Sequence, residues 1–284
     1  MPSAPTLNKV LFGIFALATV GVLVAAMVSP AVRAVAYAPL RDLIVPPPEP
    51  IVVEVLYSTE KAEWLAAVIP QWEATNPRID GRPIELSLKK MGSREMYLAV
   101  LDGEEQPDLI SPASSLQIAI LQDLSTSRFG APVVNAADQT RCRPVVESPL
   151  VLVAWKERAE VLWGDDPNGR LWHRLHDALV DPQGWEAFGH PEWGYIKFSH
   201  TNPLKSNSGF MTTLLMTYNY FGKTSGLTAS DILSDADYQE WFIELEGSIS
   251  NSGDSPGTYM EEIIAYVPIL YDIVAVYEAT AIEH

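Results

Sequence analysis

An uninterrupted apolar run near the N-terminus constrains this chain more than any other feature. From Val10 to Val28 there are nineteen residues without a charge. As an α-helix this run would be about 28 Å long, which matches the hydrocarbon core of a bilayer. A cleavable signal peptide has a shorter apolar core, about 7–15 residues, followed by a small-x-small site. Residues 34–36 (Ala-Val-Ala) form such a site, so cleavage is the alternative, but the length favours a retained signal anchor over residues 1–36.

The charges beside the apolar run do not fix its orientation. Lys9 lies before the run, and Arg33 and Arg41 lie after it. An N-terminal apolar segment that precedes one large soluble region usually exports that region. We therefore expect a single-pass protein of the cell membrane with its body on the extracytoplasmic side. Prolines at positions 46, 47, 48 and 50 predict that residues 37–50 form an extended linker.

Charge divides at the end of this linker. The chain has 19 Lys and Arg against 36 Asp and Glu, a net charge of −17. Residues 1–50 hold three basic and two acidic side chains, so residues 51–284 carry −18. Nucleic-acid binding needs clustered Lys and Arg, and this composition excludes it. With 48% hydrophobic residues the body is expected to fold, and the single Cys142 excludes an internal disulfide and a thiolate metal site.

Strands and helices alternate through the first half of the body. Apolar or alternating runs at 51–57, 84–88 and 108–110 predict strands, and each is followed by a stretch with helical periodicity. This order predicts an α/β fold with a parallel sheet and ligand sites at the carboxyl ends of its strands. The second half of the body adds further predicted elements. They are strand pieces or a crossover in 145–155, strands at 194–199 and 273–277, and helices at 156–163, 172–179, 210–221, 228–246 and 259–265.

Three of the predicted strand-to-helix junctions are rich in hydroxyl groups. They contain Ser58 and Thr59, then Ser111 with Ser114, and then Ser206-Asn207-Ser208 before Gly209. A helix N-terminus has unpaired N–H donors and the positive end of its dipole, so several such ends in one cleft can bind an anion. The alternative is that each hydroxyl only caps its own helix.

The run Trp193-Gly-Tyr-Ile-Lys-Phe-Ser-His-Thr-Asn-Pro-Leu-Lys-Ser-Asn-Ser-Gly-Phe210 resembles a signature of bacterial extracellular solute-binding proteins with the type II periplasmic-binding fold. It is most similar to the substrate-binding part of proteins that combine such a domain with a von Willebrand factor A domain. Weaker similarities lie at 55–61, 107–112, 149–154 and 271–278. No von Willebrand domain or Asp-x-Ser-x-Ser motif is present in the sequence.

The resemblance implies a two-lobed fold behind the N-terminal helix, with lobe I formed by 51–148 and 273–284 and lobe II by 149–272. It implies capture of a small polar solute, such as an oxyanion, between the lobes for transport or sensing. The residues that would bind the ligand are Ser58, Thr59, Ser111 and Ser114 from lobe I, Thr201, Ser206, Asn207 and Ser208 from lobe II, and Tyr271 and Asp272, which would orient it.

One departure from the family pattern supports a second hypothesis. The family continues after its return strand with helices that complete lobe I, whereas this sequence stops at His284. Either the C-terminus is truncated, or a transporter or another protein partner covers an incomplete lobe I. The alternative function is therefore a structural or assembly subunit that uses the binding fold to hold a protein.

Other chemistry has little support in the sequence. There is no Gly-x-Ser-x-Gly nucleophile motif, and the loop 247–254 lacks the Lys of a phosphate-binding loop. His173 and His176 are spaced for one helical face but have no third ligand pattern. His200 either contacts the ligand or braces its loop, and the aromatic cluster 218–221 is expected in the core rather than stacked on a sugar. We expect neither an enzyme nor a metal or cofactor site.

Overall fold

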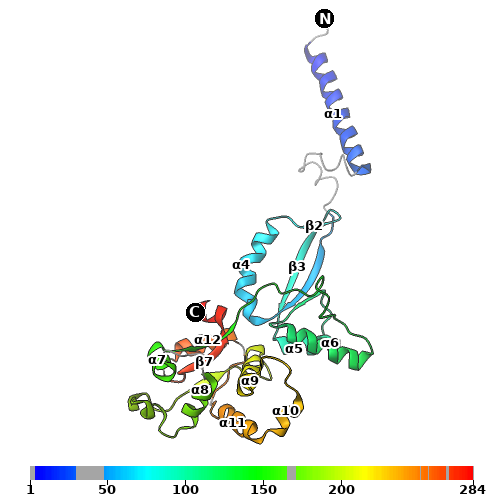
Figure 1. Ribbon diagram of the computed structural model, residues 1–284. Helices are drawn as coiled ribbons and strands as arrows, with labels where there is room; N and C mark the ends of the chain where they lie inside the picture. The colour runs from blue at the N-terminus through cyan, green and yellow to red at the C-terminus, as the bar shows by residue number, and fades with distance from the viewer. Residues whose placement is uncertain are drawn as a thin grey trace. The chain divides into compact units, whose positions relative to one another are not determined.

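The computed structural model describes residues 4–29, 48–164, 171–249, 251–254, 256–266 and 269–283 (Figure 1). Helix and strand are mixed along the chain, with 54% of the described residues in helices and 14% in strands. The chain divides into two compact units, Met1–Val52 with Thr75–Glu85 and Val53–Ala74 with Leu86–His284. The structure therefore has the expected α/β composition.

Helix α1 (Ala4–Val28) contains the apolar run. Its segment Asn8–Val28 is long and apolar enough to cross a membrane, at about 32 Å. Phe12, Phe15 and Leu17 are each at least 70% exposed, as lipid-facing side chains would be. The Ala-Val-Ala site at 34–36 and most of the proline linker lie outside the described residues.

The first sheet has four strands in the order β2-β3-β1-β4. Its strands are β1 (Ile51–Tyr57), β2 (Arg78–Ile79), β3 (Arg82–Lys90) and β4 (Leu109–Ser111). β1 and β4 are parallel, with Val55 opposite Leu109 and Tyr57 opposite Ser111. β2 and β3 form an antiparallel hairpin. Its turn is tight because Asp80 and Gly81 both have positive φ, at 52° and 80°.

The second sheet has three strands in the order β5-β7-β6. They are β5 (Leu150–Ala154), β6 (Phe198–His200) and β7 (Ile273–Tyr277). β7 is antiparallel to β5 and parallel to β6, and all five of its residues are buried. A strand buried on both faces needs the continuous apolar sequence Ile-Val-Ala-Val-Tyr that the chain supplies here.

One expectation about the sheets needs correction. The first sheet is mixed rather than parallel, because the short loop between β2 and β3 permits only a hairpin. The second sheet pairs β7 with β5 and β6, where its apolar side chains are buried on both sides, so 273–277 shares a sheet with two strands from the segment 149–272.

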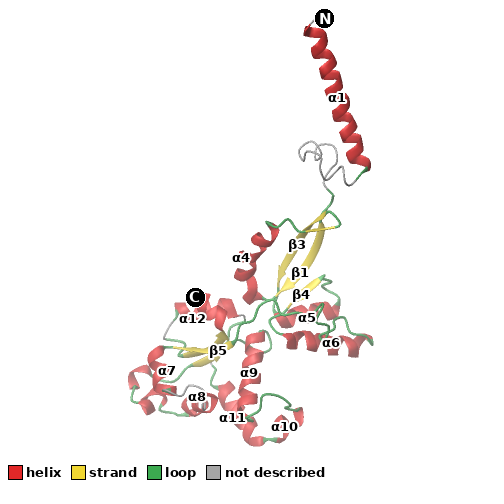
Figure 2. Ribbon diagram, turned by 45° about the horizontal axis from the view of Figure 1, so that its top comes forward, coloured by secondary structure: helices red, strands yellow, loops and turns green. Residues whose placement is uncertain are grey.

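The helices surround these sheets (Figure 2). Short 3-10 helices occur at η1 (Thr59–Lys61), η2 (Gly184–Phe188) and η3 (Pro191–Trp193). The α-helices are α4 (Ala62–Glu73), α5 (Ser93–Asp102), α6 (Ser115–Phe129), α7 (Lys156–Trp163), α8 (Leu171–Val180), α9 (Asn207–Tyr220), α10 (Ala229–Ser234), α11 (Ala236–Gly247), α12 (Pro256–Ala265) and α13 (Glu278–Glu283). Helices α9, α12 and α13 pack on the strands of the second sheet.

Local sequence signals predicted where some helices begin. The capping box at Thr228 and Asp231 is present at the start of α10, with the Asp231 N–H donating to Thr228 Oγ1 at 3.2 Å. Helix α9 begins at Asn207, three residues before its predicted start. The expected strand 194–199 is shorter and shifted to β6, because Gly194 has a φ of 70° and ends η3.

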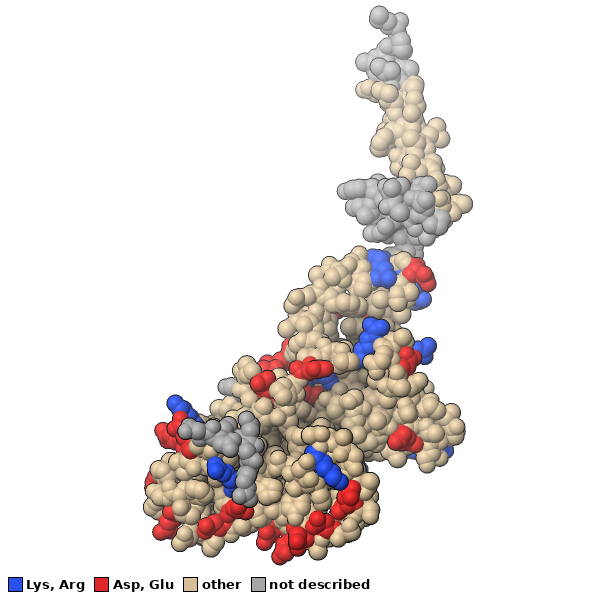
Figure 3. All heavy atoms as spheres, viewed as in Figure 1, with Lys and Arg blue, Asp and Glu red and all other residues tan. Residues whose placement is uncertain are grey.

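Figure 3 shows acidic side chains gathered over α10 and α11.

The carboxylate of Asp272 anchors the larger hydrophobic core. It is fully buried and accepts hydrogen bonds from Arg158 Nη1, from Trp185 Nε1 at 3.0 Å and from the Lys197 N–H at 2.8 Å. The Arg158 guanidinium also lies 5.3 Å from the ring centre of Trp193. This carboxylate therefore joins α7, η2, the segment before β6 and the start of β7.

We expect Asp272→Ala to lower the free energy of unfolding by about 3–5 kcal/mol, because it leaves the Arg158 charge buried without a partner. Urea unfolding of the full chain in detergent micelles measures this change. Glu160→Ala is the matched control, since its ion pair with Lys156 at 3.7 Å is exposed to solvent. That variant should change stability by less than about 0.5 kcal/mol. Equal effects of the two substitutions would show that Asp272 is not an anchor.

Candidate functional site

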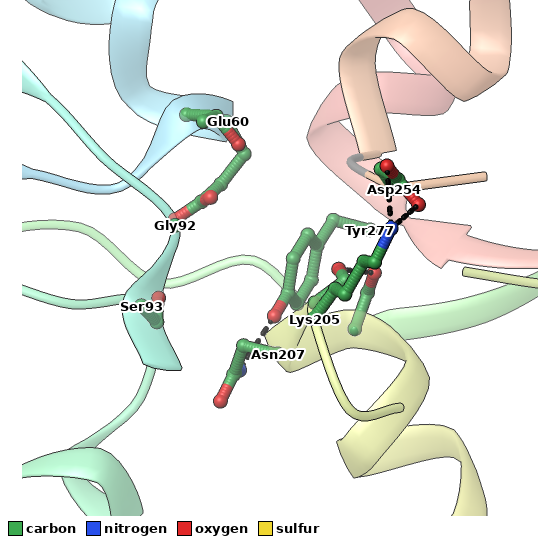
Figure 4. A pocket seen from close by; sticks show the side chains of 10 residues that line it. Glu60, Gly92, Ser93, Lys205, Asn207, Asp254 and Tyr277 are labelled. Atoms are coloured by element: carbon green, nitrogen blue, oxygen red, sulfur yellow. Dashed lines mark hydrogen bonds and ion pairs between the residues drawn. The ribbon is translucent and has the colours of Figure 1, made fainter. Parts of the chain in front are cut away.

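A small polar pocket lies where several strands of both sheets end. The space inside it that a water-sized sphere can reach is about 20 Å³, room for about one water molecule and far less than the roughly 300–1,000 Å³ of pockets that hold drug-sized ligands. Its lining comes from segments that follow the carboxyl ends of β1, β3 and β6, and from the last residue of β7. The lining residues are Thr59, Glu60, Gly92, Ser93, Lys205, Ser206, Asn207, Ser208, Asp254 and Tyr277 (Figure 4). This is the edge at which α/β sheets place their ligands.

The start of α9 forms one wall of the pocket. Gly209 allows this helix to approach the turn after β6, since a Cβ at position 209 would overlap the Thr201 carbonyl oxygen and lie 2.7 Å from its carbon. The close approach lets the Ser208 hydroxyl reach Thr201 Oγ1 at 2.6 Å, and Ser206 Oγ lies 3.0 Å from Ser208 Oγ. The Ser-Asn-Ser-Gly sequence thus builds a buried row of hydroxyls that ends at the pocket.

Asn207 joins this wall to the opposite one. Its Oδ1 accepts hydrogen bonds from Ser114 Oγ at 3.0 Å and from Gln117 Nε2 at 2.6 Å, and its Nδ2 donates to Tyr277 Oη at 2.7 Å. Three elements far apart in sequence, α6, α9 and β7, therefore meet at one amide. Burial raises the pKa of Tyr277 above its ordinary value, and the negative charge of Glu60 adds to the rise. The Tyr277 hydroxyl therefore keeps its proton at neutral pH.

Lys61 holds the turn after β1 in place. Its ammonium donates to Ser58 Oγ at 2.6 Å and to the carbonyl oxygens of Ser111 and Pro112, both at 2.9 Å. Burial lowers the pKa of Lys61 below its ordinary value, and Glu60 opposes part of that change. The lysine thus fixes the ends of β1 and β4 together without lining the pocket.

The predicted junctions differ in how they reach the pocket. Thr59, Ser206, Asn207 and Ser208 line it directly. Ser114 and Thr201 lie behind it, in hydrogen bonds to Asn207 and Ser208, while Ser58 and Ser111 belong to the Lys61 contacts. Among the described residues, the side chains of Ser58, Ser114 and Ser206 make no hydrogen bond that caps their own helices. Simple capping therefore does not explain these three serines.

Tyr271 and Asp272 lie away from the polar pocket. Both precede β7, whereas the pocket is at its other end, about 16 Å away along the strand. Asp272 is committed to the buried contacts described above, and the Tyr271 hydroxyl accepts a hydrogen bond from Asn251 Nδ2. Neither residue lines the polar pocket. They border instead an apolar groove beside Met260 and Ile263.

Sequence reasoning missed six of the ten residues that line the pocket. It overlooked a fourth junction, where Gly92 and Ser93 follow β3 and begin α5, although a Gly-Ser pair after a predicted strand could have signalled it. It also missed Tyr277, Glu60 and the exposed ion pair of Lys205 with Asp254 at 2.9 Å. Tyr277 had no signal, because its apolar strand gives no indication of which end meets other segments.

The histidines brace the fold. His200 is 1% exposed, with Nδ1 at 2.7 Å from the Thr201 carbonyl oxygen and Nε2 at 3.0 Å from Glu246 Oε1. His200 therefore braces its loop rather than contacting a ligand in the pocket, because both of its ring nitrogens have partners that do not line the pocket. His173 stacks on Tyr220 at 6.0 Å, in the aromatic core. Within the described ranges no group of three His, Cys, Asp or Glu side chains could hold a metal ion.

No protein family model matches this chain, and none of the curated proteins compared with it matches. The resemblance of residues 193–210 to solute-binding proteins therefore stays a prediction. The chemistry of the site follows from its own geometry, which combines hydroxyl donors and helix N-termini with two carboxylates and one lysine in a small pocket.

We expect Gly209→Ala to destabilise the protein by about 3 kcal/mol, because the added methyl group would force α9 away from the Thr201 backbone. Urea unfolding followed by far-UV circular dichroism measures the change. Gly247→Ala is the control, since a Cβ there meets no atom within 4 Å. That variant should be neutral or stabilised by up to about 1 kcal/mol. A neutral Gly209→Ala would contradict the close approach of α9.

Proposed function

We propose that this protein is a membrane-anchored binding protein whose body, on the extracytoplasmic side, captures a small polar solute for transport or sensing. The observation that carries the proposal is the polar pocket at the carboxyl ends of β1, β3, β6 and β7. The proposal includes a two-lobed arrangement of the type II periplasmic-binding kind, in which the two sheets belong to different lobes and the pocket lies between them.

The donors around the pocket support a ligand with hydrogen-bond acceptors. Helices α5 and α9 both begin at the pocket, and the first N–H groups of a helix have no partner inside it. The dipoles of both helices favour negative charge there. Ser93, Ser206 and Ser208 add hydroxyl groups that are each at least 94% buried. A ligand would favour a closed arrangement through its contacts with both walls.

A second candidate function is an assembly subunit that holds another protein. One observation favours it, because every residue of α4 stays partly or fully exposed although the helix carries Trp64, Leu65, Val68 and Ile69. A protein partner that covers α4 would bury those side chains. The two candidate functions differ in whether the pocket or the surface of α4 is the binding site.

We expect a solute from a panel of oxyanions, sugars and amino acids to stabilise the full chain in detergent micelles. At a concentration 100-fold above its dissociation constant, a ligand stabilises its protein by about 2.7 kcal/mol. The double variant Ser206→Ala with Ser208→Ala should weaken binding at least tenfold, since it removes two lining hydroxyls. Ser230→Ala with Ser234→Ala on the exposed face of α10 is the matched control and should bind normally.

Two results would contradict the solute hypothesis. One is a panel that gives no stabilisation while a stoichiometric protein partner copurifies with the chain. The other is unchanged solute affinity in a folded Ser206→Ala, Ser208→Ala variant, which would show that the start of α9 is not part of the binding site.

The anchor makes a separate prediction. Expressed in a bacterium, the mature protein should retain its full mass and stay in the membrane fraction after a carbonate wash, because α1 is long enough to span the bilayer. Protease added to spheroplasts should digest the body. A soluble product that has lost its first 36 residues would show a cleaved signal peptide instead, and a protected body would place it in the cytoplasm.

A further inference from the structure

Three buried hydroxyl groups on the pocket wall have protons without an acceptor. Ser93 Oγ accepts the Ala113 N–H at 3.0 Å, and Tyr277 Oη accepts from Asn207 at 2.7 Å. For both, the described residues provide no acceptor for the hydroxyl proton. Ser93 is 3% exposed and Tyr277 8% exposed, so bulk water does not readily replace a missing acceptor.

The third hydroxyl follows from counting protons along the row in α9. Thr201, Ser208 and Ser206 carry three hydroxyl protons, but only two hydrogen bonds join them. One proton is therefore left over, at Thr201, at Ser206 or, where Ser208 accepts from both neighbours, at Ser208. At Thr201 it would be fully buried without an acceptor, which is costly. Ser206 and Ser208 both line the pocket, so the left-over proton at either of them can be donated to a ligand there.

The acceptor on the same pocket is Glu60. Its side chain is 15% exposed, and its Oε1 contacts Ser58 Oγ and lies 3.5 Å from Lys61 Nζ. Oε2 has no hydrogen-bond or ion-pair partner among the described residues. The Lys61 ammonium is already bonded to one hydroxyl and two carbonyl oxygens, so it does not supply the pocket with a positive charge.

The other charges of the pocket compensate each other. Lys205 Nζ lies 3.0 and 2.9 Å from the two carboxylate oxygens of Asp254. This ion pair leaves Glu60 as the one lining carboxylate with a free oxygen among the described residues. Figure 4 shows Glu60, Gly92 and Ser93 on one side of the pocket and Lys205, Asn207, Asp254 and Tyr277 on the other. A simple anion would satisfy the hydroxyl donors but would leave the free oxygen of Glu60 without a partner, although Lys61 compensates part of the Glu60 charge.

We propose that the solute is a small zwitterion, whose carboxylate accepts hydrogen bonds from Ser93, Ser206 and Tyr277 and whose ammonium group binds the Glu60 carboxylate. The inference rests on the proposed function, because it names the ligand class of the same pocket. It assigns binding roles to Glu60, Ser93 and Tyr277, and it makes Glu60 the residue that separates zwitterions from simple anions. The space that a water-sized sphere can reach is about 20 Å³, so the pocket walls must separate to admit this ligand.

Isothermal titration calorimetry on the full chain in detergent micelles tests the ligand class with matched probes. Glycine and 4-aminobutanoate are compared with acetate and butanoate, which lack the ammonium group, and with methylammonium and butylammonium, which lack the carboxylate. At least one zwitterion should bind tenfold or more tightly than both of its matched single ions. Two zwitterions are used because their charges are separated by different distances.

Variants then assign the two ends of the ligand. Glu60→Gln should reduce the preference for the zwitterion over its matched carboxylate to about twofold or less. Tyr277→Phe should weaken the zwitterion and the carboxylate by the same factor, at least fivefold. Glu63→Gln, an exposed carboxylate on α4, is the control and should leave the preference unchanged. Near-UV circular dichroism identifies a variant that fails to fold. In that case the preference of the wild-type protein for zwitterions over the matched single ions tests the ligand class by itself.

The outcomes separate this inference from the proposed function. Carboxylates, phosphate or sulfate that bind as tightly as the zwitterions, with loss of binding in the Ser206→Ala, Ser208→Ala variant, would overturn the zwitterion and keep a solute-binding pocket. A preference that survives Glu60→Gln in a folded protein would overturn the role of Glu60. If neither these probes nor the wider panel of solutes bind, both proposals are wrong.

Discussion

The buried carboxylate of Asp272 is the contact on which the arrangement of the second sheet depends. A buried carboxylate is stable only when its hydrogen-bonding capacity is filled, and here a guanidinium, an indole and a backbone N–H fill it. These donors come from α7, η2 and the residue before β6. They fix the residue at which β7 begins. Because β7 is five residues long, they also fix the residue at its other end. That residue is Tyr277, whose hydroxyl lines the pocket.

The pocket has a similar dependence on contacts that are distant in sequence. Gly209 lets α9 approach the turn after β6, and Lys61 joins the ends of β1 and β4. Asn207 then links α6, α9 and β7 through one side chain. Each contact satisfies the hydrogen-bonding capacity of a neighbouring polar group. Removing one contact therefore leaves other polar groups buried without partners. In the pocket, hydroxyl protons and one carboxylate oxygen have no partner among the described residues.

Local patterns were informative where a few neighbouring residues decide the structure. The apolar run at 10–28 predicted α1, the capping box at 228–231 predicted the start of α10, and Ile-Val-Ala-Val-Tyr predicted β7. Which strands pair with each other could not be predicted from such local patterns. An apolar strand such as β7 is equally suited to either sheet, and the sequence alone did not show that it pairs with β5 and β6. The distance of Tyr271 and Asp272 from the pocket was not readable for the same reason, because their end of the strand is set by Arg158, Trp185 and Lys197.

By itself the sequence determined a membrane-length helix, an acidic α/β body and hydroxyl-rich helix starts, because these follow from hydropathy, charge and short-range hydrogen bonding. Only the tertiary structure decided which of those starts meet. It brought Ser93 and Tyr277 beside Ser206, and it left Glu60 with a free oxygen on the same pocket. The physical reason is that these contacts join residues from 20 to more than 200 positions apart. Their geometry is set by the packing of sheets and by buried polar groups, which no local pattern encodes.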